Sequence, residues 1–190
     1  HTTSSYTAVE QGILTTQTNG AFLGSALDSS GHQHLMRAAA DVGGFVIYVS
    51  QEDDSGWTHS PVPTGVDLAD PIQVVIDGND TAAAVYRDAV NEQLIFLHQT
   101  GGNWVNTVLG DAGAAVSGDF APLILSNGNL AIALIHDDGT NHNLSVWIFN
   151  GSNVSGSSIT GLTDLSSNIS MEITDNDVLN LSHREADLTL

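Results

Sequence analysis

The sequence predicts an all-β protein built from four repeats of about 48 residues, and two observations support this fold class. First, four turn segments of similar composition recur along the chain, each directly after an apolar run. Second, the turns are followed by short runs rich in β-branched and aromatic residues, and no useful length of the chain has helical periodicity. An internal period of this length is typical of a repeat architecture.

The turns set the period. Each is rich in Asp, Asn, Ser and Gly, the residues that favour hairpin loops. The polar residues that open the turns align as Asp28, Asp77, Ser126 and Thr174, which lie 49, 49 and 48 residues apart.

The strands after each turn follow one plan. The next strand ends in an acid, aligned as Asp41, Asp88, Asp137 and Glu185. A β-branched and aromatic strand comes third, then a tight turn, and then a fourth strand that begins near Trp57 in one copy and Trp104 in the next. Four short strands per copy with regular turns are typical of a β-propeller blade.

We therefore expect a single β-propeller-like domain over residues 1–190, with blades at 23–70, 71–120 and 121–168 and a partial blade at 169–190. The segment 1–22 continues the partial blade, because Leu190 followed by His1-Thr-Thr matches Leu97-His98-Gln-Thr. This segment is predicted to form the missing strand, either closing its own ring or donated to a neighbouring subunit. Donation would make the protein self-associate through its N-terminal strand.

The charge balance excludes several partners. The chain has 22 acidic residues, three arginines and no lysine, for a formal net charge of −19. Nucleic-acid binding needs a basic surface, so we expect no nucleic-acid partner. No run approaches the roughly 18 apolar residues of a membrane span, so we expect no membrane insertion. Cysteine is absent, which excludes disulfides and thiolate metal sites. The first residue is His1 rather than Met, and we expect a processed protein that is extracellular or on the cell surface.

Residues 122–137 and 144–151 resemble the repeat of secreted bacterial β-propeller proteins: an apolar strand, an Asn-Gly turn, a strand ending in Asp, then another strand and a Gly turn. The chain is similar, more distantly, to tachylectin-type and fucose-binding lectin propellers. The resemblance spans about residues 25–190 and its motif is one of folding. The lectin likeness implies sugar sites between blades, with Trp57 and Trp104 as ligand-binding candidates. Their counterparts are only Val154 and Tyr6, so such sites would not repeat fully.

Two further candidates are cationic. Arg87, His136 and Arg184 align at one repeat position, each followed by an acid. Arg87 and Arg184 are therefore candidates for a ligand-binding rim, and the alternative is that each cation only offsets its acidic neighbours.

Six Asn-X-Ser/Thr sequons lie mostly in predicted turns, where a glycan could be carried. The candidate glycosylation sites are Asn79, Asn143, Asn150, Asn153, Asn168 and Asn180.

Metal and cofactor signals are weak. His32 and His34 are two residues apart on a predicted strand and project to one face, as a metal pair or as an ordinary exposed pair. Acid clusters at 52–54, 77–80, 137–138 and 175–177 leave structural calcium open, but none has the full spacing of a calcium loop. We expect no metal site and no cofactor.

No motif in the chain points to catalysis. The sequence has no Gly-X-Ser-X-Gly elbow, no phosphate-binding loop and no His-Glu-X-X-His helix. We therefore expect that the protein is not an enzyme. The prediction is an extracellular structural or assembly protein, a subunit of a glycosylated filament or surface layer. The alternative is a glycan-binding, lectin-like propeller.

Overall fold

The computed structural model describes residues 23–41, 44–63, 72–111, 120–137, 142–159, 165–174 and 178–185. All the regular elements in these segments are β-strands, so the all-β prediction is confirmed. No helix in the described segments is long and apolar enough to cross a membrane.

The strands form four antiparallel sheets, called blades 1 to 4 below. Blade 1 contains β1 (Leu23–Leu27), β2 (Gln33–Asp41), β3 (Gly44–Asp53) and β4 (Gly56–Pro63). Blade 2 contains β5 (Gln73–Ile76), β6 (Ala82–Arg87), β7 (Gln93–Thr100) and β8 (Asn103–Asp111). Blade 3 contains β9 (Phe120–Ile124), β10 (Leu130–Asp137), β11 (His142–Phe149) and β12 (Val154–Ile159). Blade 4 shows two strands, β13 (Leu165–Ile173) and β14 (Leu179–Glu185). In every blade the strand order follows the chain.

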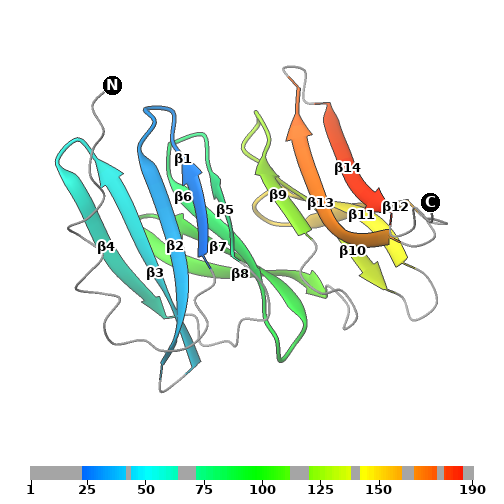
Figure 1. The fold of residues 1–190 in the computed structure, drawn as a ribbon, viewed down its shortest axis with the longest axis horizontal. Coiled ribbons are helices and arrows are strands. Elements are labelled where there is room, and N and C mark those ends of the chain that lie inside the picture. Colours follow the sequence, from blue (N-terminus) through cyan, green and yellow to red (C-terminus); the bar gives the residue numbers. More distant parts are fainter. Residues whose placement is uncertain are drawn as a thin grey trace, which may run out of the picture.

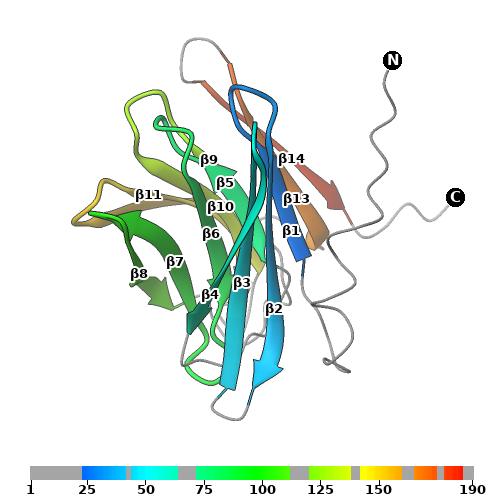
Figure 2. The same ribbon diagram turned by 90° about the vertical axis from the view of Figure 1, so that its left-hand side faces the viewer.

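The first strands of successive blades pack side by side, as in a propeller. β1 contacts β5, β5 contacts β9, and β9 contacts β13 (Figure 1). Gly24 makes the first of these approaches close, because a Cβ there would lie 2.8 Å from Cγ2 of Val74. Figure 2 shows the blades from the side, splayed around these inner strands. Among the described strands, β13 does not pack comparably on β1, and Figure 1 shows blades 1 and 4 at opposite ends.

The predicted N-terminal strand falls on residues 1–22, which lie outside the described residues. The third strand expected at 187–190 also lies outside them. Pairing of the N-terminal segment with the last blade therefore stays a prediction.

The hairpin between the first and second strands has the same backbone bonds in every blade. The amide of the opening residue donates to the carbonyl four residues on, from Asp28 to His32 at 3.0 Å and from Asp77 to Thr81 at 2.9 Å. In blade 3 the same bond runs from Leu125 to Asn129, and in blade 4 from Thr174 to Val178.

The alignment of the third turn on Ser126 was therefore wrong by one residue, since Leu125 opens it. The aspartates that open the first two turns also cap them, because Oδ1 of Asp28 and Oδ1 of Asp77 each accept two backbone N–H bonds. In blade 3 the residue that opens the turn has no polar side chain, and Oδ1 of Asn127 caps the amide of Asn129 instead. Ser126 is a residue type that commonly opens turns, but it lies one residue after Leu125, which opens this one.

Alternation along the strands gives blades 2 and 3 two buried faces each. Tyr86, Ile95 and Leu97 of blade 2 pack on blade 1, in a cluster that includes Met36 and Ile47. The cluster between blades 2 and 3 comprises Val75, Ala83, Val85, Leu94, Phe96, Leu109, Phe120, Leu130, Ile132, Leu134 and Phe149. Residues one apart on a strand point to opposite faces, so neighbouring residues of β6 enter different clusters.

Candidate functional site

A cavity of about 170 Å³ lies between blades 2 and 3, at the end of the blades where the β5–β6 and β9–β10 hairpins turn. Blade 2 contributes the larger share of its lining: Asp77, Thr81, Ala82, Ala83, Phe96, His98 and Gln99. Blade 3 contributes Ile124, Gly128, Leu130, Phe149 and Gly151. The volume would hold about six water molecules at about 30 Å³ each, so the cavity suits a small ligand or one unit of a larger one.

Three aromatic rings form one wall. The Phe96 and His98 rings are stacked, with centroids 4.7 Å apart and planes 11° apart. Phe149 of blade 3 meets Phe96 edge to face at 6.1 Å. Because Phe96 and Phe149 also belong to the core, their rings are fixed by packing on both sides. The wall is therefore preformed.

Asp77 and Thr81 add polar groups beside this wall. Oδ1 of Asp77 accepts the amides of Asn79 at 2.8 Å and Thr81 at 2.9 Å, which fixes the orientation of the carboxylate. Gln99 also lines the cavity, but it follows His98 on β7 and pairs with Trp104, so its side chain is on the opposite face of the strand. A carboxylate and a hydroxyl at the rim of an apolar cleft are the few placed polar groups that orient a ligand.

His98 is held as a neutral ring. Its Nε2 lies 3.0 Å from Oγ1 of Thr107, and its Nδ1 lies 3.4 Å from Oγ1 of Thr100. Burial lowers the pKa of His98, because the interior disfavours the imidazolium form. The ring therefore brings no positive charge to the cavity.

The repeat explains why the cavity lies here. Counting from the strand pairs Leu27–Gln33 and Ile76–Ala82, Ala83 of blade 2 is equivalent to His34 of blade 1. Counting from the turn bonds, Gly128 of blade 3 is equivalent to Asp80 of blade 2. Large polar side chains thus stand between blades 1 and 2 where small ones stand between blades 2 and 3.

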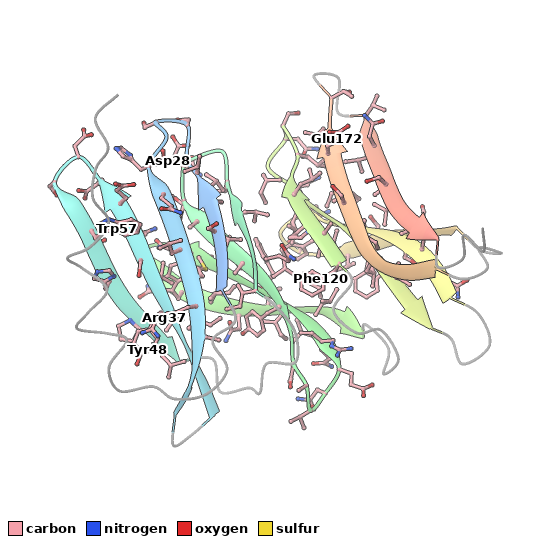
Figure 3. The ribbon with its side chains drawn as sticks, in the orientation of Figure 1. Asp28, Arg37, Tyr48, Trp57, Phe120 and Glu172 are labelled. Atoms are coloured by element: carbon pink, nitrogen blue, oxygen red, sulfur yellow. The ribbon has the colours of Figure 1, made fainter. Side chains whose placement is uncertain are left out.

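Those polar side chains are bonded to residues of blade 1. Oδ2 of Asp28 lies 3.2 Å from both Nδ1 of His32 and Nε2 of His34, and Nε2 of His32 lies 3.2 Å from Oδ1 of Asp54. Figure 3 shows Asp28 at the turn end of blade 1. Asp80 accepts the amide and hydroxyl of Ser29 from across the blade gap.

The network shifts two pKa values. Burial alone would raise the pKa of Asp28, but the bonds from the His32 amide, the His34 ring and the Ser30 amide outweigh it and lower the value to about 2. The hydrogen bond to Asp54 raises the pKa of His32, burial opposes it, and Asp28 adds to the increase. His32 and His34 thus converge on a carboxylate. Within the described ranges, no group of three or more His, Asp or Glu side chains is placed to hold a metal ion.

The tryptophans do not line the cavity. Trp57 pairs with Glu52 and Trp104 pairs with Gln99, one step past equivalent turns. Trp104 is partly buried against the core cluster of blades 1 and 2. Trp57 is also partly buried and lies nearly parallel to His59, with ring centroids 6.4 Å apart.

Arg87 also lies away from the cavity lining. Arg87 and Arg184 are equivalent, five residues past Ala82 and Leu179. His136 was wrongly aligned with them, because Ile135 holds that position in blade 3. The error has the same cause as that at Ser126, a turn that opens one residue earlier. The side chain of Arg184 is outside the described residues.

The sequons differ in accessibility. Asn79, Asn150, Asn153 and Asn180 are exposed, whereas Asn143 is only 5% exposed and pairs with His136 inside a sheet. Asn168 lies in β13, and its side chain is outside the described residues.

The cavity residues Phe96, His98, Gln99 and Phe149 were not predicted as a site. The available signal was a difference between repeats: Ala83 and Gly128 at positions where other copies carry His34 and Asp80. This difference can be recognised only when the third turn is aligned on Leu125.

No protein-family model matches the chain, and no curated protein matches it. Among solved structures, it is similar to a fucose lectin from Kordia zhangzhouensis in complex with methyl-fucoside, with 15% identity and a TM-score of 0.47 over 73% of this chain and 99% of that one. It is also similar to a protein from Bacteroides uniformis ATCC 8492 provisionally assigned as a 6-phosphogluconolactonase, with 14% identity and a TM-score of 0.47. That match covers 86% of this chain, which spans half the length of the other.

Proposed function

We propose that this protein binds a neutral carbohydrate, with one sugar unit in the cavity between blades 2 and 3. The observation that carries the proposal is the preformed wall of Phe96, His98 and Phe149 beside the polar groups of Asp77 and Thr81. A sugar ring has an apolar face of C–H groups and a rim of hydroxyls. An aromatic wall beside a carboxylate and a hydroxyl complements both.

The charge of the chain selects among sugars. With a formal net charge of −19, the surface repels anionic ligands, and Asp77 adds a carboxylate at the cavity itself. Uronic acids, sialic acids and sugar phosphates should therefore bind poorly, and uncharged hexoses or deoxyhexoses should bind best.

We propose binding without catalysis. Both nitrogens of His98 lie within hydrogen-bond distance of threonine hydroxyls, and Oδ1 of Asp77 is occupied by two turn amides. These bonds support a fixed recognition surface, in contrast to a group that exchanges protons with a substrate. Recognition of free or surface glycans also agrees with the proposed extracellular location.

The test is a glycan array followed by calorimetric titration of the best neutral sugar. Ala83→His should block the cavity, because blade 1 already accommodates a histidine at the equivalent position, bound to Asp28. Thr81→Val should remove a hydroxyl from the rim of the cavity and keep the shape of the side chain. Each variant should lose at least tenfold in affinity, about 1.4 kcal/mol.

The control is Gln93→Ala, at the far end of the strand that carries Phe96 and His98 and outside the cavity lining. It should bind like the parent protein. Binding that survives Ala83→His would place the sugar elsewhere, and an array without neutral-glycan binding would end the proposal.

A further inference from the structure

Blades 1 and 2 open their first hairpins on equivalent aspartates, Asp28 and Asp77. Oδ1 of each aspartate accepts the backbone amides two and four residues further along the chain. These bonds are both 2.9 Å long at Asp28, and they are 2.8 Å and 2.9 Å long at Asp77. Because the same two bonds hold both carboxylates, the second oxygen, Oδ2, has an equivalent position in the two blades.

In blade 1 this second oxygen is fully used within the chain. Oδ2 of Asp28 lies 3.2 Å from Nδ1 of His32 and 3.2 Å from Nε2 of His34. An ionised carboxylate only accepts hydrogen bonds, so both ring nitrogens donate to it. Two donors from neighbouring side chains therefore converge on one carboxylate oxygen.

In blade 2 shorter side chains replace the two histidines. Thr81 is the equivalent of His32, and Ala83 is the equivalent of His34. Thr81, Ala83 and Asp77 all line the cavity between blades 2 and 3. No group in the described part of the chain donates to Oδ2 of Asp77. The acceptor that blade 1 satisfies with its own side chains is thus left to donors that enter the cavity.

The hydroxyls of a sugar are donors of the required kind. Hydrogen bonds to an ionised carboxylate are stronger than those between neutral groups, so this oxygen is the strongest acceptor that Asp77 offers. Two hydroxyls on adjacent ring carbons converge on one acceptor when they are gauche to each other, as the two ring N–H groups converge in blade 1. The C–H groups of the same sugar ring can then pack on the wall of Phe96 and His98.

We propose that Oδ2 of Asp77 is the specificity-determining acceptor of the cavity, and that the preferred ligands are neutral sugars with two adjacent gauche hydroxyls. These hydroxyls occupy the positions that the two histidine N–H groups occupy around Asp28. The inference rests on the proposed function, since a sugar must enter the cavity. It adds the atom that selects the sugar and the hydroxyl pattern that is selected.

Asp77→Asn tests the acceptor and keeps the hairpin. An asparagine caps a turn in the same way, because Oδ1 of Asn150 accepts the amides of Ser152 at 3.1 Å and Asn153 at 2.9 Å. With Oδ1 held by the turn, the amide nitrogen replaces Oδ2 and presents a donor where the carboxylate accepted. The probe is the neutral methyl hexoside with the highest affinity for the parent protein. Its affinity, measured by calorimetric titration, should fall at least tenfold, with an unfolding midpoint close to that of the parent.

The matched control is Asp28→Asn, which makes the same change in the equivalent turn outside the cavity lining. It should bind the glycoside like the parent protein, whatever its effect on stability. Monodeoxy analogues of the glycoside then locate the hydroxyls. In the parent, removal of either of two adjacent hydroxyls should lower affinity about tenfold. In Asp77→Asn the same two removals should have little further effect, because their shared partner is already lost.

The outcomes separate this inference from the proposed function. If the glycoside binds and Ala83→His blocks it, but Asp77→Asn binds as tightly as the parent, the cavity binds sugar and the role of Asp77 is overturned. Equal deoxy losses in the parent and in Asp77→Asn would overturn it too. A single sensitive hydroxyl in the parent would overturn the adjacent pair, and this measurement needs no substitution. A parent protein that binds no neutral glycoside would remove the proposed function and this inference together.

Discussion

Asp80 of blade 2 holds the hairpin of blade 1 through Ser29, accepting its amide at 2.9 Å and its hydroxyl at 2.6 Å. The two residues are 51 positions apart, and the pair joins consecutive blades at their turn end. Hydrogen bonding to the Ser29 hydroxyl and amide lowers the pKa of Asp80. The equivalent of Asp80 in blade 3 is Gly128, so this link is absent where the cavity opens.

Replacing Asp80 should lower the thermal unfolding midpoint. Its φ of 57° is in the left-handed region, which glycine adopts without strain, so Asp80→Gly should lose only the Ser29 bonds. Asp80→Ala should be worse, because it loses the bonds and keeps the strained backbone. Calorimetry would measure both. Ser29→Ala should have no further effect in the Asp80→Gly background, and additive losses would contradict the pairing.

The bonds of His32 to Asp54 and Asp28 should give the protein a stability maximum in mildly acid solution. The raised pKa of His32 contributes stability below its reference value of 6.5, and this is lost as pH rises through the raised value. The lowered pKa of Asp28 contributes stability above 3.8, and this is lost as pH falls toward about 2. The difference in unfolding midpoint between the parent and His32→Gln should therefore be largest between about pH 4 and 6.5. A difference that does not vary with pH would show that these carboxylates do not stabilise protonated His32.

Trp104→Ala should destabilise the protein by about 3 kcal/mol, because a large ring packed on the core of blades 1 and 2 leaves a cavity. Trp57→Ala should lower the free energy of unfolding by less than about 1 kcal/mol in dilute solution, since no described strand packs on the face of blade 1 where Trp57 lies. Urea unfolding of both variants checks the order. A loss below about half a kcal/mol for Trp104→Ala would show that its ring contributes little packing.

Trp147 of β11 lies between two glycines, and one of them has no room for a side chain. A Cβ at Gly156 would lie 2.8 Å from Cδ1 of the indole, and one at Gly110 would lie 3.3 Å from Cη2. Gly156→Ala should destabilise by about 1–3 kcal/mol through overpacking. Gly78→Ala is the control, because no atom lies within 4 Å of its Cβ, and its effect should stay within about half a kcal/mol in the same urea experiment.

Expression through an N-glycosylating secretory route should modify some of the exposed sequons and spare Asn143. A buried amide cannot reach the glycan-transfer enzyme once the sheet has formed. Glycopeptide mass spectrometry would assign each site. An unmodified intact mass would remove the glycoprotein prediction, and a glycan on Asn143 would mean transfer before folding.

Local chemistry made the strands and most turns predictable. Asp28 and Asp77 are turn residues by composition, and each caps its own hairpin as expected of an aspartate there. The third turn was misplaced because Leu125 opens it with its backbone amide, and a backbone hydrogen bond does not depend on the type of side chain. The His136 error followed from the same slip.

The cavity could not be predicted from the sequence, for a different reason. It depends on side chains that are small, Ala83 and Gly128, at positions brought together only by packing between blades. Small residues are common in strands and turns. A small residue therefore indicates a cavity only when the register of the two neighbouring blades is known. Likewise the sequence left His32 and His34 as a metal pair or an ordinary exposed pair, whereas His34 is buried and both rings lie against Asp28.

The strand order has a consequence for how the chain folds. Each sheet is assembled from strands consecutive in sequence, so the entropy lost in closing each hairpin is small and a blade can form soon after its residues leave the ribosome. The face of blade 1 that contains Met36 and Ile47 stays exposed until blade 2 has formed and covers it. During that interval the nascent chain exposes an apolar sheet, and the rate of elongation through residues 72–111 sets how long aggregation has to compete with folding.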